Sequence, residues 1–204
     1  MDKRESWDGY RIVLASASPR RKELLGQIGI HPEIRPSHME EETGEKKPDR
    51  VVMELSRQKA EDIAAGCGAG TMVIGADTVV AVGNEILGKP GTPMRAYEMI
   101  EKLQGRTHQV YTGVTVLLCH GEDKVHGITF SEKTDVHVYP MTSQEISEYA
   151  GCGEPLDKAG AYGIQGKFAA YIKGIDGDYT NVVGLPLGRL NQEIKGLLED
   201  REDD

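Results

Sequence analysis

Residues 71–82 read TMVIGADTVVAV, and this stretch decides the fold. It is β-branched and apolar over almost its whole length, which is the composition of a strand buried on both faces of a sheet. Gly83 and Asn84 follow, so the pattern predicts a turn and a short strand that pairs back onto the first one. Asp77 is the one charged residue in the run. Because burying an unpaired carboxylate is costly, we expect Asp77 to meet a metal, a cation or a catalytic role, the alternative being an aspartate that caps a turn.

Strand and helix patterns alternate on both sides of this run. The residues 107–119 and 124–139 form two long strands that predict a hairpin. The fold class is therefore α/β, with a mixed, partly antiparallel sheet flanked by helices. The other predicted elements are strands at 11–16, 31–36 and 169–173, a turn at 174–177, and helices at 19–28, 48–65, 93–103, 143–150 and 186–198, with Ser18 and Thr142 as N-caps and Glu145 in a capping box.

The chain has 204 residues, 38% of them hydrophobic, and a net charge of −9. We interpret residues 1–204 as a single domain, with a core at about 11–198 and an acidic tail at 199–204 that carries −4 of this charge. An acidic chain with 5% aromatic residues is not expected to bind nucleic acid as a coat protein. The sequence lacks an apolar run of the roughly 20 residues that a membrane helix needs and a leader-like start, so we expect no membrane partner and a cytoplasmic location.

The segment from Ser16 to Lys22, SASPRRK, joins a predicted strand to a predicted helix. Backbone N–H groups at a helix start, flanking hydroxyls and three successive cations suit a bound polyphosphate. The alternative is an ordinary capped helix whose Arg and Lys side chains face water. From this segment alone, the ordinary helix is the better interpretation.

Residues 83–90, GNEILGKP, nearly match the phosphate-binding loop pattern G-x-x-x-x-G-K-[ST]. Pro90 replaces the residue whose hydroxyl binds magnesium and removes a backbone donor, which excludes a Walker-type ATPase. Lys89 could still direct its charge at a phosphate from a turn, or it could be a solvated lysine.

Two other segments carry groups that suit a nucleotide site. Residues 40–42 are three glutamates that could help hold a hard cation such as Mg²⁺, although most acidic triplets only solvate a loop. Gln165, in the glycine-rich run 151–166, offers a donor and an acceptor that could recognise the edge of a base, and a tight structural loop is the competing explanation. The histidines and the three cysteines lack metal-ligand spacing.

Together these segments resemble the Maf-like nucleotide pyrophosphatases over nearly the whole chain. The resemblance implies a metal-dependent reaction in which a nucleoside triphosphate and water give the monophosphate and pyrophosphate. It also implies a Maf/inosine triphosphatase-like fold, in which two lobes flank a deep central cleft, and a homodimer. The matching stretches are LASASPRRKELL (14–25), RQKA (57–60), GADTVV (75–80), LGKP (87–90), GRTHQVYTGV (105–114), EPLDKAGAYGIQG (154–166) and IDGDYTNVVGLPL (175–187).

Within this family, the branch that acts on dTTP and UTP has arginine, threonine and glutamine at three marker positions. Here these residues are Arg20, Thr78 and Gln165, whereas the 7-methyl-GTP branch typically has an aromatic residue, glutamine and glutamate. The resemblance further implies that Asp77 is the general base, that Glu41 and Asp77 hold Mg²⁺ or Mn²⁺, and that Gln165 selects the base. The groups implied around the triphosphate are Ser16, Arg20, Arg21, Lys22, Lys59 and Lys89.

Two other functions are weighed against a house-cleaning dTTP/UTP pyrophosphatase, which could also accept modified pyrimidine nucleotides. One is a nucleotide-binding regulator of septum formation that does not need turnover, because the family name is tied to cell division. The other is a triphosphatase for noncanonical purines, which Arg20, Thr78 and Gln165 disfavour.

Overall fold

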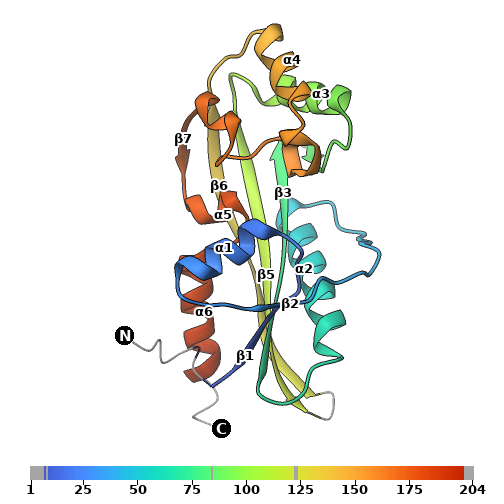
Figure 1. Ribbon diagram of the computed structural model, residues 1–204, viewed down its shortest axis with the longest axis vertical. Helices are drawn as coiled ribbons and strands as arrows, with labels where there is room; N and C mark the ends of the chain where they lie inside the picture. The colour runs from blue at the N-terminus through green and yellow to red at the C-terminus, as the bar shows by residue number, and fades with distance from the viewer. Residues whose placement is uncertain (1–6, 8, 84, 122–123, 200–204) are drawn as a thin grey trace.

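A mixed β-sheet forms the centre of the computed structural model, which describes residues 7, 9–83, 85–121 and 124–199 (Figure 1). Within these residues the strands lie in the order β2-β1-β3-β5-β6-β7, and β4 pairs with β3. β1 is parallel to β2 and β3, and the other pairs are antiparallel, as the predicted mixed sheet requires. The strands are β1 (Arg11–Leu14), β2 (Glu33–Ile34), β3 (Thr71–Val82), β4 (Glu85–Leu87), β5 (Thr107–Gly121), β6 (Lys124–Val138) and β7 (Ile172–Asp176).

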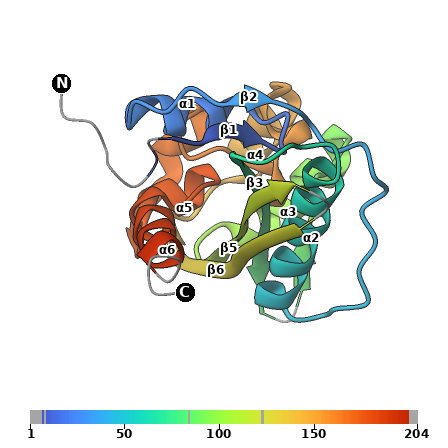
Figure 2. The ribbon, with the colours of Figure 1, turned by 90° about the horizontal axis from the view of Figure 1, so that it is seen from below.

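The predicted central strand has the predicted bounds, and helices cover both of its faces. Figure 2 shows α2 on one side of β3, β5 and β6, and α5 and α6 on the other. α2 approaches very closely where Gly75 and Gly113 leave room, because a Cβ atom would lie 2.3 Å from the Ser56 carbonyl oxygen at Gly75 and 2.1 Å from that of Val52 at Gly113. The helices are α1 (Pro19–Gln27), α2 (Pro48–Ala64), α3 (Pro93–Leu103), α4 (Ser143–Gly151), α5 (Tyr179–Val183) and α6 (Leu187–Glu199).

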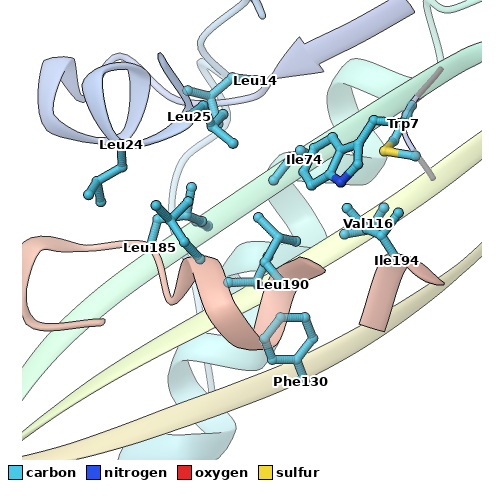
Figure 3. Packing of buried hydrophobic residues seen from close by; sticks show 14 of the residues in the cluster. Trp7, Leu14, Leu24, Leu25, Ile74, Val116, Phe130, Leu185, Leu190 and Ile194 are labelled. Atoms are coloured by element: carbon cyan, nitrogen blue, oxygen red, sulfur yellow. The ribbon is translucent and has the colours of Figure 1, made fainter. Parts of the chain in front are cut away.

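Two hydrophobic clusters divide the molecule into two lobes. The first lobe packs around α1 and α6, and the second packs around α3, α4 and the segment 154–171. Because β3, β5 and β6 contribute buried residues to both clusters, the long strands join the lobes. Figure 3 shows the first cluster, which includes Trp7, Leu14, Leu24, Leu25, Ile74, Val116, Leu190 and Ile194. The single-domain assignment and its boundaries stay a prediction.

Local signals in the sequence explain the helix starts. Thr142 and Glu145 form the predicted capping box, with the Thr142 N–H donating to Glu145 Oε2 at 2.7 Å. Ser18 is the N-cap residue of α1 as predicted, but its side chain makes no capping hydrogen bond. Instead the Ser18 N–H donates to Ser16 Oγ at 3.2 Å. The hydroxyl of Ser16 thus supports the start of α1.

The sequence prediction differs from the structure in the C-terminal third and at the first two strands. Residues 167–171 are a 3₁₀ helix, so the strand predicted at 169–173 begins only at Ile172 and runs through most of the predicted turn. α5 was not predicted, and it begins where the Asp178 carboxylate accepts from the Thr180 N–H at 2.7 Å. β1 and β2 are also shorter than predicted, because β1 pairs with β3 only from Arg11 to Leu14 and β2 pairs with β1 over only two residues.

Some sequence expectations concern residues that the structure does not describe. Asn84, predicted in the turn before β4, and residues 200–204 of the acidic tail lie outside the described residues. Within the described chain, the structure contains no helix with the length and apolar character that crossing a bilayer requires.

Candidate active site

A cleft of about 660 Å³ opens between the two lobes. Its walls come from the β1–α1 connection and α1 start, the loop before α2, the middle of β3, the β4 end, the glycine-rich segment and the end of α5. These segments are far apart in the sequence, and the sheet brings them together. The cleft is lined by every residue of the predicted site except Lys22: Ser16, Arg20, Arg21, Glu41, Lys59, Asp77, Thr78, Lys89 and Gln165.

Asp77 and Lys59 form an ion pair in the cleft wall. The Lys59 ammonium lies 2.6 Å from Asp77 Oδ1 and 2.9 Å from Glu41 Oε1. The side chains of Lys59 and Asp77 are only 15% and 13% exposed, whereas that of Glu41 is 55% exposed. Lys59 therefore supplies the positive charge that the buried position of Asp77 requires.

The second oxygen of Asp77 has no hydrogen-bond partner among the described residues. Burial alone would raise the pKa of Glu41. The hydrogen bond and charge of Lys59, together with the charges of Lys89 and Arg21, outweigh that effect and hold the pKa below its usual value. Of the three consecutive glutamates, Glu41 is the one that lines the cleft. Two carboxylates, those of Asp77 and Glu41, thus face the same part of the cleft.

The oxygen donors of Asp77 and Glu41 fit a hard divalent cation. Both carboxylates contact one nitrogen, Lys59 Nζ, so they already converge on a place where positive charge is held. Mg²⁺ in proteins commonly takes one or two carboxylates and completes its shell with water and substrate phosphates. The described residues contain no cluster of three His, Cys, Asp or Glu side chains that could enclose a metal. Asp77 and Glu41 are the two carboxylates of the cleft that could contact such a cation together.

Arg21 joins four segments at the floor of the cleft. Its guanidinium donates from Nε to the Gly184 carbonyl oxygen at 2.8 Å, from Nη1 to Ser16 Oγ at 2.9 Å, and from Nη2 to Thr78 Oγ1 at 3.0 Å. Thr78 continues the network to Thr112 Oγ1 at 3.0 Å. Burial lowers the pKa of Arg21, and the charge of Asp77 opposes that shift. Three of the five N–H groups of Arg21 are therefore committed to protein acceptors.

The other cations of the cleft have different surroundings. Arg20 and Lys89 line the cleft and make no hydrogen bond or ion pair among the described residues. Lys22 was expected to join them, but it is exposed on α1 and does not line the cleft. Each residue of an α-helix is turned by about 100° from the one before it, so Lys22 lies on a different side of α1 from Arg20. The cleft also contains Asp157 and Lys158, which the sequence reasoning did not single out. In all, five cationic and three anionic side chains line it, so a basic cleft exists in an acidic chain.

The glycine-rich segment forms the wall that the second lobe contributes. Gly160 has φ +66°, and a Cβ atom there would lie 2.7 Å from the Val80 side chain, so the segment packs tightly on β3. The Tyr162 hydroxyl hydrogen-bonds with His108 Nε2 at 2.7 Å. Burial lowers the pKa of His108 to about 4, so this histidine is a neutral structural group. Gln165 is exposed in the cleft, and its amide has no partner among the described residues.

Comparison with known proteins identifies the family of this chain. The family model described as Maf-like protein matches residues 11–197. The chain belongs to the Maf-like protein family. A Maf relative from Lachnoclostridium phytofermentans, named dTTP/UTP pyrophosphatase, is 52% identical over 91% of this chain and 94% of its own length. A protein of the same name from Agathobacter rectalis is also 52% identical, over 92% of this chain and 97% of its own length. The solved structure of the Staphylococcus aureus Ham1 protein is 16% identical, with a TM-score of 0.42 over 62% of this chain and 71% of that chain.

The sequence reasoning grouped the Maf site residues but missed how they contact one another. Nothing local distinguishes Arg20 from Arg21, yet one faces the open cleft and the other is bound to Gly184, 163 positions away. The three acceptors that surround the Arg21 guanidinium come together only in the tertiary fold. Asp157 had a usable signal, because it lies in the run EPLDKAGAYGIQG on which the resemblance to Maf proteins rests.

Proposed function

We infer that this Maf-family protein hydrolyses dTTP and UTP to the nucleoside monophosphate and pyrophosphate. The observation that carries the inference is a single cleft that joins the Lys59–Asp77–Glu41 cluster to the unpaired cations Arg20 and Lys89. Relatives with 52% identity over at least 91% of the chain are named for this activity. The marker residues of the pyrimidine branch, Arg20, Thr78 and Gln165, all line the same cleft.

Water attacks the α-phosphorus, a bond forms between the water oxygen and that phosphorus, and pyrophosphate leaves. Asp77 accepts the water proton through the carboxylate oxygen that Lys59 does not occupy. Lys59 orients the carboxylate and supplies positive charge next to the reacting group. Negative charge develops on the phosphate oxygens and on the leaving pyrophosphate, so Arg20 and Lys89 stabilise the transition state more than the bound substrate.

A divalent cation, Mg²⁺ or Mn²⁺, is proposed as the cofactor, with Asp77 and Glu41 as its protein ligands. When bound, it neutralises phosphate charge and positions the triphosphate. Ser16 and the backbone N–H groups at the start of α1 add donors to the same phosphates, because the first N–H groups of a helix lack partners within the helix. Arg21 holds Ser16 in place by donating to its hydroxyl oxygen, and Arg21 is itself held by its hydrogen bond to Thr78.

Gln165 is proposed to select the pyrimidine. Its amide offers one acceptor and two donor hydrogens, which match the alternating carbonyl and N–H groups on the edge of uracil and thymine. A site built on such hydrogen bonds rejects a base with the opposite pattern more strongly than an apolar pocket does. Modified pyrimidine nucleotides with an unchanged edge are expected substrates.

The surroundings in which the enzyme works are also proposals. We place it in the cytoplasm, since the three cysteines are unpaired thiols and nucleotide pools are its substrates. A homodimer is proposed from the resemblance to Maf proteins. No nucleic acid or membrane partner is part of the proposal, because the chain is acidic overall and its cleft, which five cationic side chains line, is sized for a small polyanion.

A panel of nucleotides tests the proposal. Purified protein with Mg²⁺ or Mn²⁺ is incubated with UTP, dTTP, CTP, GTP, ATP and ITP, and pyrophosphate and orthophosphate are measured separately. We expect pyrophosphate release with UTP and dTTP well above the other nucleotides. Release of orthophosphate, or faster turnover of ITP than of UTP, would show a different reaction or a different substrate class. Binding of UTP without any turnover would instead support the regulator hypothesis.

A further inference from the structure

The turn that carries Gln165 is anchored by its backbone and by Ile164, which packs against both hydrophobic clusters. Residues 163–166 form a turn in which the Gly166 N–H donates to the Gly163 carbonyl oxygen at 3.1 Å. Gln165 lies at the third position of this turn, and its side chain is exposed in the cleft. Because the amide itself lacks a partner among the described residues, its direction depends on how the backbone of the turn is held, at Ile164 and at its two ends.

One carboxylate, that of Glu154, holds both ends. Glu154 Oε2 accepts from the Lys167 N–H at 3.0 Å, which holds the end of the turn directly. Glu154 Oε1 accepts from the Tyr149 hydroxyl at 3.1 Å. Gly163, at the start of the turn, lies beside the same groups: its backbone is next to the Tyr149 hydroxyl, and a Cβ atom on it would lie 3.9 Å from Glu154 Oε1. We call Tyr149 and Glu154, with these contacts to Gly163 and Lys167, the Glu154 clamp.

The shape of the turn is matched to the clamp. A Cβ atom on Gly166 would lie 2.2 Å from Glu154 Oε1, so the carboxylate lies directly against this glycine. The backbone of Glu154 is itself held, because the Lys158 ammonium donates to its carbonyl oxygen at 2.6 Å. Tyr149 is 4% exposed, and its ring packs against Phe168 with the ring centroids 5.1 Å apart. The core of the second lobe therefore holds Tyr149 and Glu154 in place, independently of their contacts with the turn.

Neither Tyr149 nor Glu154 lines the cleft. Their hydrogen bonds go to the backbone on either side of Gln165 and not toward the space that a nucleotide occupies. Any effect of the clamp on the substrate must therefore pass through the turn. A carboxylate acceptor makes stronger hydrogen bonds than a neutral one, so the loss of either contact should release one end of the turn.

We propose that Tyr149 and Glu154 are positioning residues for base recognition, which hold the 163–166 turn so that the Gln165 amide faces the pyrimidine edge. This inference rests on the proposed function of Gln165. It adds that base selectivity depends on two side chains outside the cleft. It also explains why a partly buried carboxylate is kept next to a glycine with no space for a side chain.

Tyr149→Phe tests the proposal, because it removes one hydroxyl and keeps the ring. The ratio of kcat/KM for UTP to that for CTP should fall on the order of tenfold, as expected for the loss of one hydrogen bond to a charged acceptor. The change should appear mainly in KM for UTP. Tyr139→Phe is the matched control, since the Tyr139 side chain is 50% exposed and lies outside the cleft lining, and its ratio should not change.

A double-mutant cycle separates positioning from a general effect on folding. In a Gln165→Ala background, Tyr149→Phe should leave the UTP/CTP ratio unchanged, because the group it positions is gone. An equal fall in both backgrounds would overturn the proposal, and so would an unchanged ratio in Tyr149→Phe alone. Glu154→Gln provides a second variant if Tyr149→Phe is unstable, and the same cycle applies to it. Failure of the proposed function is distinct, because the wild-type protein would then release no pyrophosphate from UTP.

Discussion

Replacing Arg21 with lysine should destabilise the floor of the cleft. Arg21 donates three hydrogen bonds, of 2.8, 2.9 and 3.0 Å, to three different segments. A lysine ammonium in the same place reaches at most one of these acceptors, so two lose a charged donor. A hydrogen bond from a charged donor contributes about 1.5 to 3 kcal/mol, and we use the lower value because the Arg21 side chain is partly exposed. We therefore expect Arg21→Lys to lower the free energy of unfolding by about 3 kcal/mol.

Urea denaturation followed by circular dichroism measures this change. Arg20→Lys is the matched control, because Arg20 has the same side chain at the preceding position and makes no hydrogen bond or ion pair among the described residues. Its free energy of unfolding should stay within about 0.5 kcal/mol of wild type, while KM for UTP rises because a guanidinium binds phosphate in a forked geometry that lysine lacks. Equal stability losses in the two variants, or a loss in Arg21→Lys below about 0.5 kcal/mol, would refute the separate roles of these arginines.

Three further predictions concern stability and metal use. Burial lowers the pKa of His108 from 6.5 to about 4, so the unfolded chain binds a proton in this window that the folded chain does not, and stability falls as pH drops from 6.5 toward 4. Urea titrations should show a loss of about 1 kcal/mol between pH 7 and pH 5.5 that His108→Gln removes, and parallel slopes would contradict this origin. Gly113→Ala should lower the free energy of unfolding by about 3 kcal/mol in the same assay, because the added Cβ atom would collide with α2. Gly26→Ala is the control and should not lower it, because open space surrounds Gly26. Similar losses in the two variants would argue against the close approach of α2 at Gly113. Glu41→Gln should raise the Mg²⁺ concentration for half-maximal activity by at least about tenfold while Glu40→Gln should not, and an equal response of both variants would exclude Glu41 as a ligand.

The sequence predicts the parts of this fold that depend on local pattern. The bounds of β3 follow from its apolar, β-branched run, and the start of α4 follows from a capping box whose two partners are three residues apart. α5 was missed because it has five residues and begins at an Asp178 contact that resembles an ordinary turn in the sequence. Periodicity requires longer segments than this to separate a helix from a loop.

The candidate site shows the same division between local and tertiary information. A carboxylate inside an apolar strand already requires a compensating charge, so Asp77 could be singled out from the sequence alone. The identity of its partner could not, because Lys59 reaches Asp77 only when α2 packs on β3. The committed donors of Arg21 and the exposed position of Lys22 also depend on how α1 is rotated against the sheet. Family resemblance located these residues, and only the structure separates those that face the cleft from those that support it.

The most direct test of the assigned chemistry compares Asp77→Asn with Asp62→Asn. Asp62 is also an aspartate, lies on α2 three residues after Lys59, and is not part of the cleft lining. The measurement is kcat for pyrophosphate release from UTP with Mg²⁺, together with the melting temperature of each variant. We predict that Asp77→Asn loses on the order of 10²- to 10⁴-fold in kcat while remaining folded, and that Asp62→Asn keeps wild-type kcat. A folded Asp77→Asn protein with wild-type kcat would contradict the assignment of Asp77 as the general base.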